Sequence, residues 1–216
     1  MAQAKLRQLF PEPFIWARAV KLFYSGRSHL VQSGYVESIR RRHPCDAQGS
    51  PLPWMNYAVV FFLEQRLQPD HTLFEYGSGF STRFYARRVS HVTSVEHDRG
   101  WFDKGKEDLP PNVELLHVDL NDGDRYVNAI QGTGRQFDIV IIDGRQRERS
   151  ALAAVASLTP GGVIIFDDSD RERYQAARGA LRESGFRVID FRGLKPGGMS
   201  AHQTSIFYRD DNCLGI

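Results

Sequence analysis

From residue 72 onward, short apolar runs alternate with segments whose apolar residues recur at helical spacing. Short apolar runs suit strands buried on both faces, and the intervening segments suit helices that cover a parallel sheet. This alternation predicts an α/β protein. The predicted strands are 72–76, 91–96, 113–118, 137–142, 163–166, 186–191 and 204–208. The predicted helices between them are 81–89, 99–108, 147–158 and 171–184.

The last two predicted strands are joined without a helix. Only the glycine-rich segment Gly193–Gly198 and a few polar residues separate them. Such a link is too short for the crossover that parallel neighbours require. We therefore expect an antiparallel hairpin here, whereas a fully parallel dinucleotide-binding fold would have another helix.

The chain before residue 72 has a different pattern. Residues 12–24 and 30–42 are predicted helices, and the Pro- and Gly-containing segment 46–53 is a predicted linker. Residues 54–67 form a further predicted helix, which we expect to pack on the sheet.

Charge separates the N-terminal part from the rest. Residues 1–43 contain eight basic and two acidic residues, although the chain of 216 residues has a net charge of only +2. We assign 1–53 to an N-terminal helical extension and 54–216 to the domain, and expect the extension to act as a lid or as a homodimer element. Its basic and aromatic residues also permit peripheral membrane contact, whereas nucleic acid is not an expected partner. The preferred expectation is that its helices pack on the domain.

The composition is that of an ordinary globular protein, with 41% hydrophobic and 25% charged residues. No apolar run reaches the ~18 residues of a membrane span, and the prolines at 11 and 13 interrupt any leader. Cys45 and Cys213 are too few for a disulfide framework or a metal cluster. We expect free thiols and a cytoplasmic protein.

A glycine turn follows the first predicted strand. The strand ends in Glu75–Gly79, which reads Glu-Tyr-Gly-Ser-Gly, and the next strand ends in a second acid, Glu96. Glycines are needed where the chain turns sharply and a ligand touches the backbone, and an acid at the second strand can accept the hydroxyls of a ribose. Ser81 or Thr82 is a candidate cap of the following helix. Because Thr82 replaces the third glycine of the nicotinamide fingerprint, the sequence predicts a nucleoside pocket of another kind.

This pattern resembles motif I and the ribose-binding acid of class I S-adenosylmethionine-dependent methyltransferases. Leu158–Phe166 is similar to the segment at that family's fifth strand, and Ser94–Trp101 resembles a group of poorly characterised bacterial methyltransferase-like proteins. The resemblance implies a Rossmann-like fold, a seven-stranded mostly parallel sheet of order 3-2-1-4-5-7-6 with helices on both faces, and S-adenosylmethionine as cofactor. It assigns cofactor binding to Glu75, Tyr76, Gly77, Ser78, Gly79, Ser81, Thr82, Glu96, His97, Asp119, Leu120 and Asp143.

Three acids follow the fourth and fifth predicted strands: Asp143, Asp167 and Asp168. Adjacent strand ends would bring them together, and clustered carboxylates suit Mg²⁺. The cluster is similar to the metal site of the catechol O-methyltransferase branch, with Asp168 where that branch has Asn. The preferred alternative is that Asp143 hydrogen-bonds the cofactor ammonium or its own loop, while Asp168 or Asp170 caps the following helix. Arg145 and Arg171 could also neutralise the carboxylates without a metal, or grip an anionic substrate.

Asp143 and His202 are the candidate catalytic residues. A histidine titrates near neutral pH, and His202 is predicted to lie in the loop before the last strand, where substrates enter this fold. Methyl transfer needs little beyond alignment of the acceptor. Substrate binding is assigned to Trp54, Tyr57, Arg145, Asp168 and Arg171.

The leading hypothesis is methyl transfer from S-adenosylmethionine to a small-molecule or glycan-like acceptor, at oxygen. One alternative is a non-catalytic scaffold or sensor that binds the same cofactor. Another is a nicotinamide-dependent oxidoreductase, which the incomplete glycine fingerprint and the terminal hairpin disfavour.

Overall fold

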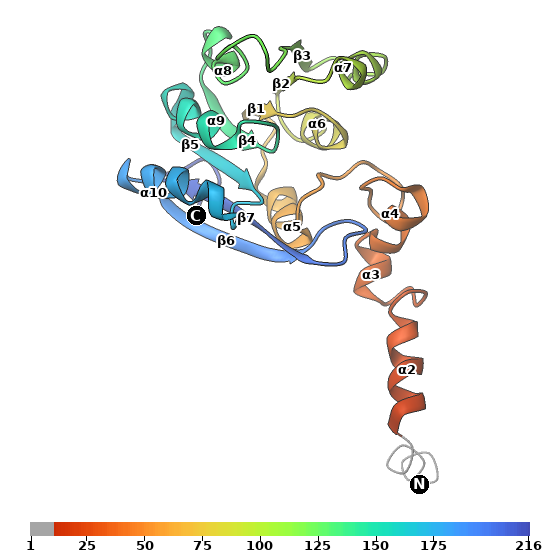
Figure 1. The fold of residues 1–216 in the computed structure, drawn as a ribbon. Coiled ribbons are helices and arrows are strands. Elements are labelled where there is room, and N and C mark those ends of the chain that lie inside the picture. Colours follow the sequence, from red (N-terminus) through yellow and green to blue (C-terminus); the bar gives the residue numbers. More distant parts are fainter. Residues whose placement is uncertain (1–10) are drawn as a thin grey trace.

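The computed structural model describes residues 11–216, which contain one seven-stranded sheet (Figure 1). Its order, β3-β2-β1-β4-β5-β7-β6, confirms the order that the resemblance implies. β7 pairs antiparallel with β5 and β6, so the expected hairpin is present, and the other pairs are parallel. The strands are β1 (Thr72–Tyr76), β2 (His91–Glu96), β3 (Val113–His117), β4 (Phe137–Ile142), β5 (Leu158–Asp167), β6 (Arg187–Leu194) and β7 (Ala201–Tyr208).

Helices cover both faces of the sheet because the central strands are apolar on both sides. Along β1, Leu73 packs in a core with residues of α5 and α6, whereas Phe74 packs on the opposite face with residues of α8, α9 and α10. α7 lies beside α6 (Figure 1). The helices are α5 (Tyr57–Arg66), α6 (Phe80–Ala86), α7 (Arg99–Lys106), α8 (Ala129–Gly132), α9 (Arg147–Ala154) and α10 (Gln175–Glu183).

β5 is longer than predicted. The segment Thr159–Gly162, which we expected to be a turn, lies inside the strand at a register shift between β4 and β5. A Cβ on Gly162 would lie 2.9 Å from the Phe137 carbonyl oxygen, so the glycine allows the irregular strand to pass its neighbour.

Other element boundaries also differ from the prediction. β6 and β7 extend into the glycine-rich link, because the two strands continue to pair from Arg187↔Tyr208 to Leu194↔Ala201. His202 therefore lies in a strand and not in a loop. Two 3₁₀ turns, Val155–Ser157 and Glu172–Tyr174, replace an end of each of the last two predicted helices. The short helix α8 has no counterpart in the prediction.

Within residues 11–53, the described part of the N-terminal extension, there are three helices: α2 (Pro11–Lys21), α3 (His29–Gln32) and α4 (Tyr35–Arg41). The predicted helix 30–42 is broken at Gly34, whose φ is +83° and where a Cβ would lie 2.2 Å from the Cys45 carbonyl oxygen. α4 packs on the domain as expected, with Tyr35 buried. The expectation is wrong for α2, which buries no residue and projects away from the sheet (Figure 1).

Part of the extension lies outside this description. Lys5 and Arg7, two of its basic residues, fall in residues 1–10, outside the described part of the chain. Within residues 11–216, no helix combines the length and apolar character that crossing a bilayer would require.

Candidate functional site

The glycine turn after β1 lies against the end of β4 at the carboxyl edge of the sheet. Gly77 has a φ of +92°, and a Cβ there would lie 2.8 Å from the Gly144 Cα. A side chain at Gly77 would therefore force the ends of β1 and β4 apart. The sequence places bare backbone where the strand tips meet.

Glu75 lies beneath this turn and is fully buried. It accepts hydrogen bonds from the Ser81 hydroxyl, from Thr82 Oγ1 at 2.6 Å and from Ser94 Oγ at 2.9 Å. Thr82 Oγ1 also accepts from the Gly79 N–H at 3.0 Å. The N-cap of α6 is Gly79, and Thr82, in the first turn, caps the helix start through its bond to the Gly79 N–H. Ser81 is not a cap, and both hydroxyls tie the first turn to Glu75. Burial outweighs these hydrogen bonds and raises the pKa of Glu75 to about 7.

Replacing Glu75 with glutamine is expected to change how stability depends on pH. Because the folded-state pKa is above the ordinary value of 4.5, the native state binds more protons than the unfolded state between these values, and stability falls as pH rises through that window. The glutamine variant lacks this loss. Denaturant unfolding measures the free energy of unfolding at about pH 5 and about pH 8. Between these pH values, the free energy of the wild type should fall by about 2–3 kcal/mol more than that of the variant. If the wild type and the variant differ in unfolding free energy by the same amount at both pH values, Glu75 does not have the raised pKa that burial predicts.

Glu96 ends β2 and is only 4% exposed. Its Oε2 accepts from the Ser78 N–H and the Ser78 hydroxyl, both at 3.1 Å. Its Oε1 accepts from the N–H groups of His97 and Asp98, both at 2.8 Å. The carboxylate is therefore fixed by its own strand end and by the glycine turn, and it faces the space between them.

That space is a cavity of about 320 Å³ at the carboxyl edge. It brings together predicted residues of the turn, of β2 and of β4 with the N-terminal Trp54. Residues that the sequence analysis did not assign also line it, and one of them, Pro44, comes from the N-terminal extension. The lining is Pro44, Trp54, Gly77, Ser78, Gly79, Phe80, Ser81, Glu96, His97, Trp101, Asp143, Gly144, Arg145 and Arg147.

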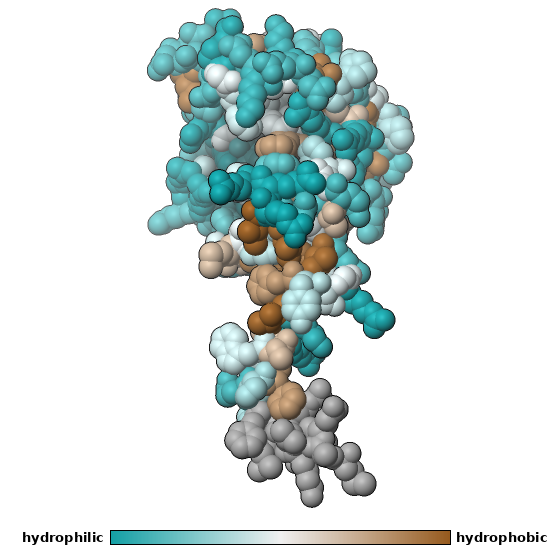
Figure 2. Space-filling model, turned by 90° about the vertical axis from the view of Figure 1, so that its right-hand side faces the viewer, coloured by the Kyte–Doolittle hydropathy of each residue, from teal (hydrophilic) through white to brown (hydrophobic). Residues whose placement is uncertain are grey.

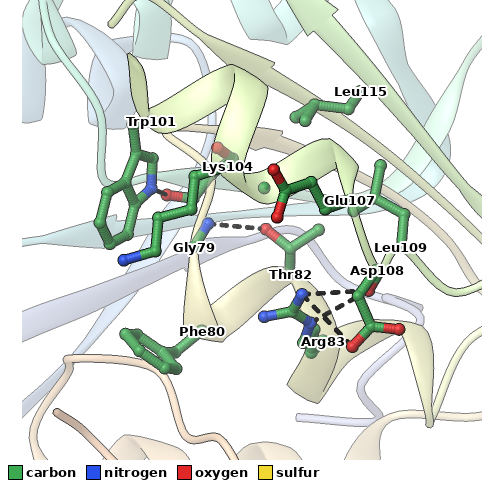
Figure 3. Close-up of a pocket in the computed structure, with 12 residues that line it drawn as sticks. Gly79, Phe80, Thr82, Arg83, Trp101, Lys104, Glu107, Asp108, Leu109 and Leu115 are labelled. Atoms are coloured by element: carbon green, nitrogen blue, oxygen red, sulfur yellow. Dashed lines mark hydrogen bonds and ion pairs between the residues drawn. The ribbon is translucent and has the colours of Figure 1, made fainter. Parts of the chain in front are cut away.

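Two aromatic contacts close the cavity. The Trp101 indole N–H donates to the Ser78 carbonyl oxygen at 2.8 Å, and the ring lies 3.7 Å from the position of a Cβ on Gly79. His43 from the extension stacks on Phe80 with ring centroids 4.5 Å apart. A smaller hollow of about 230 Å³ lies between α6 and α7 on the other side of Trp101 (Figure 3), where Arg83 contacts the Asp108 carbonyl at 3.0 Å.

Several predicted residues lie outside the cavity lining. The Tyr76 hydroxyl is buried and donates to the Val127 carbonyl at 2.6 Å. Asp119 is exposed and accepts from its neighbour Asn121, while Leu120 packs against the core. Tyr57 is buried beside α3, where burial raises its pKa to about 12. Glu75 and Thr82 also do not line it: they support the turn from below.

The predicted acid cluster does form, but two cations occupy its centre. Arg147 Nη2 lies 2.7 Å from Asp143 Oδ1, and Arg147 Nη1 lies 3.5 Å from carboxylate oxygens of Asp167 and Asp168. Lys195 Nζ lies 2.6 Å from Asp167 Oδ2 and 2.8 Å from Asp168 Oδ1. Each of the three carboxylates therefore has a protein cation as its partner.

This arrangement corrects the prediction of Mg²⁺ at Asp143, Asp167 and Asp168. Among residues 11–216, no group of three acidic, histidine or cysteine side chains is arranged to hold a metal ion. Arg147 and Lys195 stand where a metal would bind, so the residues present do not fit the ion. The sequence analysis expected arginines to neutralise the cluster but named Arg145 and Arg171. Of these, Arg171 does pair with Asp168, whereas Arg145 is an exposed residue at the cavity wall.

His202 and Asp168 form a pair beside this cluster. His202 Nδ1 lies 3.0 Å from Asp168 Oδ1, and His202 Nε2 lies 3.1 Å from Ser200 Oγ. Burial raises the pKa of Asp168, but hydrogen bonding and charge from Lys195, with the charges of Arg147 and Arg171, outweigh it and lower that pKa to about 2. Asp168 is therefore a carboxylate at neutral pH. It can hold the His202 Nδ1–H and leave Nε2 as an acceptor.

The loop before β7 is held by Tyr35 of the N-terminal extension and by Trp54, the first residue of the domain. The Tyr35 hydroxyl donates to the Gly198 carbonyl at 2.8 Å, and the Trp54 indole donates to the Pro196 carbonyl at 3.1 Å. The extension thus contacts the same loop that carries Lys195.

Residues 74–169 match a family described as a methyltransferase domain. A protein-L-isoaspartate O-methyltransferase of Bradyrhizobium sp. (strain ORS 278) is 30% identical over 112 residues, which is 50% of this chain and 50% of that protein. The chain therefore matches only half the length of this curated relative.

Two solved structures share the fold. One is a Klebsiella pneumoniae protein whose assignment as an O-methyltransferase is provisional. It is 16% identical to this chain, the match covers 89% of this chain and 94% of the Klebsiella chain, and the TM-score is 0.56. The other is precorrin-8W decarboxylase of Methanobacterium thermoautotrophicum, 19% identical over 71% of this chain and 89% of its own, with a TM-score of 0.54. The two structures show the shared fold, and residues 74–169, less than half of the chain, are the part that matches the methyltransferase-domain family.

Proposed function

We propose that this protein transfers a methyl group from S-adenosylmethionine to an oxygen of a small-molecule or glycan-like acceptor. The observation that carries the proposal is the cavity in which the Gly77–Gly79 backbone and the Glu96 carboxylate face the same space. The Bradyrhizobium relative is named an O-methyltransferase, which supports an oxygen acceptor. The free thiols of Cys45 and Cys213 support a reducing cytoplasm.

The residues of the cavity fit this cofactor. Glu96 offers carboxylate oxygens to a ribose diol, the glycine turn offers bare backbone, and Phe80, Trp54 and Trp101 supply apolar walls. When bound, S-adenosylmethionine supplies an electrophilic methyl group. Trp54 lines the cavity, and His43 of the extension stacks on the lining residue Phe80.

We assign His202 as the base that prepares the acceptor. The acceptor hydroxyl would give its proton to His202 Nε2, and its oxygen would form the new bond to the methyl carbon while the bond from that carbon to the sulfonium sulfur breaks, which leaves S-adenosylhomocysteine. Asp168 holds Nδ1–H and stabilises the resulting imidazolium. Lys195 and Arg147 keep Asp168 ionised and fixed in place.

Replacing His202 with alanine is expected to lower kcat by about 10²- to 10⁴-fold, which is the usual contribution of a general base. Affinity for S-adenosylhomocysteine should stay within about twofold, because His202 does not line the cofactor cavity. The assay is S-adenosylhomocysteine formation with an acceptor found in a screen of hydroxylated compounds. Ser200→Ala is the matched control and should keep most of the activity. Unchanged kcat in the His202 variant would remove the base assignment.

Calorimetric titration tests the proposal as a whole. S-adenosylmethionine and S-adenosylhomocysteine should bind the wild type with micromolar affinity, and NADH should not bind. NADH binding in their place would favour the oxidoreductase. Tight cofactor binding with no turnover across all acceptor classes would favour the scaffold or sensor.

A further inference from the structure

The segment 11–24 exposes most of its apolar surface to solvent. It consists of α2 and the turns that follow, and α2 buries no residue. Six of the twelve exposed large apolar side chains of residues 11–216 lie here, each between 48% and 66% exposed. They are Ile15, Trp16, Val20, Leu22, Phe23 and Tyr24. In Figure 2, apolar and aromatic side chains line the stem that projects from the polar domain. Soluble domains rarely leave so continuous an apolar surface without a partner.

The basic residues of α2 lie close together on the helix, whereas Glu12 lies on the apolar side, between Ile15 and Trp16 around the helix axis. At helical spacing, Arg18 and Lys21 lie three residues apart on one face. Ile15, Trp16 and Val20 lie on the remaining arc, which covers roughly half of the circumference. The acidic residue of α2, Glu12, lies in its first turn. The helix is therefore amphipathic, with a broad apolar face and a cationic border.

This shape favours a bilayer surface over a second copy of the chain. A helix-pair seam needs a narrow apolar stripe, whereas a broad face with Trp, Phe and Tyr beside Arg and Lys suits half-immersion in the headgroup region. Charge points the same way: residues 1–43 have a net charge of +6, and the rest of the chain is therefore net acidic. An anionic surface would attract the extension and repel the domain.

We propose that residues 11–24 dock the protein on an anionic phospholipid bilayer. From this segment the chain continues through α3 into α4, and Tyr35 of α4 contacts the loop 195–200 beside the acceptor side. Docking would therefore place the membrane next to the part of the chain that covers the site. The proposal does not depend on catalysis and is tested without turnover.

The test is co-sedimentation of the full chain with phosphatidylcholine vesicles, with and without 30 mol% phosphatidylserine as roughly the physiological anionic fraction. We expect binding to the anionic vesicles that weakens as salt rises. Trp16→Ser/Phe23→Ser and Arg18→Glu/Lys21→Glu should each weaken binding roughly tenfold or more. Leu152→Ser, which removes an exposed apolar side chain on α9, is the matched control and should bind as the wild type does.

A second measurement locates the contact. In a Trp54→Phe/Trp101→Phe variant, Trp16 is the remaining tryptophan, and its fluorescence should be quenched by brominated lipids. Two results would overturn the proposal. One is equal vesicle binding by the Trp16→Ser/Phe23→Ser variant. The other is absence of vesicle binding together with a dimer that this variant dissociates, as expected if the helix of one copy fills the hollow of about 370 Å³ beside His29 and Phe61 of another.

Discussion

Glu96→Gln is expected to weaken S-adenosylhomocysteine binding by about 100-fold. The carboxylate accepts four hydrogen bonds from Ser78, His97 and Asp98. The glutamine amide has only one oxygen. Its NH₂ group, a donor, would therefore face other donors: either the N–H groups of His97 and Asp98, or the N–H and hydroxyl of Ser78. Hydrogen bonds to a charged acceptor contribute about 1.5–3 kcal/mol each, and the ribose loses its acceptor as well. Calorimetry measures the affinity.

The matched control is Asp119→Asn at the end of the neighbouring strand. Asp119 is exposed, and its side chain accepts hydrogen bonds from the backbone and the side chain of Asn121. We therefore expect a change of less than about threefold. If the two variants lose affinity equally, the adenosine contacts extend to β3 and the ribose assignment of Glu96 is not specific. If Glu96→Gln binds as the wild type does, the cavity is not the cofactor site.

Lys195→Met is expected to destabilise the protein by about 3–5 kcal/mol. Lys195 Nζ pairs with Asp167, which is fully buried, and with Asp168, which is 4% exposed. Removing one partner of a buried ion pair leaves an uncompensated charge, which costs far more than the pair itself contributes. For a chain of this length, the corresponding loss is about 10 °C in Tm. Thermal unfolding followed by circular dichroism measures it.

Arg187→Met is the control for this substitution. Its pair with Asp210 is 65% and 70% exposed, and exposed pairs contribute less than about 1 kcal/mol. Millimolar Mg²⁺ or Mn²⁺ should raise the Tm of the Lys195→Met variant but not that of the wild type. The reason is that the substitution leaves the carboxylates of the cluster without Lys195, and carboxylates suit a hard cation. If divalent cations raise the Tm of the wild type by the same amount, the cluster is a metal site and Lys195 is not its cation.

The cations inside the cluster bear on how the acceptor is activated. In a site with a divalent ion, the ion would lower the pKa of the acceptor hydroxyl directly. Here the charges of Lys195 and Arg147 are already paired with the carboxylates of Asp143, Asp167 and Asp168. In the proposed function, activation is therefore assigned to His202, which these cations contact only through Asp168.

Much of this architecture could be predicted from local pattern. The alternation of apolar runs with helical spacing determines the order of strands and helices, because burial on both faces of a sheet requires it. The short link between β6 and β7 determines their antiparallel pairing. The positions of Gly77 and Glu96 follow from the same pattern, since strand ends are where a parallel sheet exposes backbone and side chains to a ligand.

The tertiary structure decided which charges meet. Lys195 lies in a glycine-rich link, and nothing in its neighbours indicates that it reaches two buried carboxylates of β5 and its end. Glu75 matches a ligand-binding motif in sequence, yet three hydroxyls enclose it beneath the turn. The apolar residues of α2 predict a packed helix, but the helix has no surface of its own domain against it. Sequence periodicity reports which residues share a face; pairing between distant segments depends on how those faces are brought together in space.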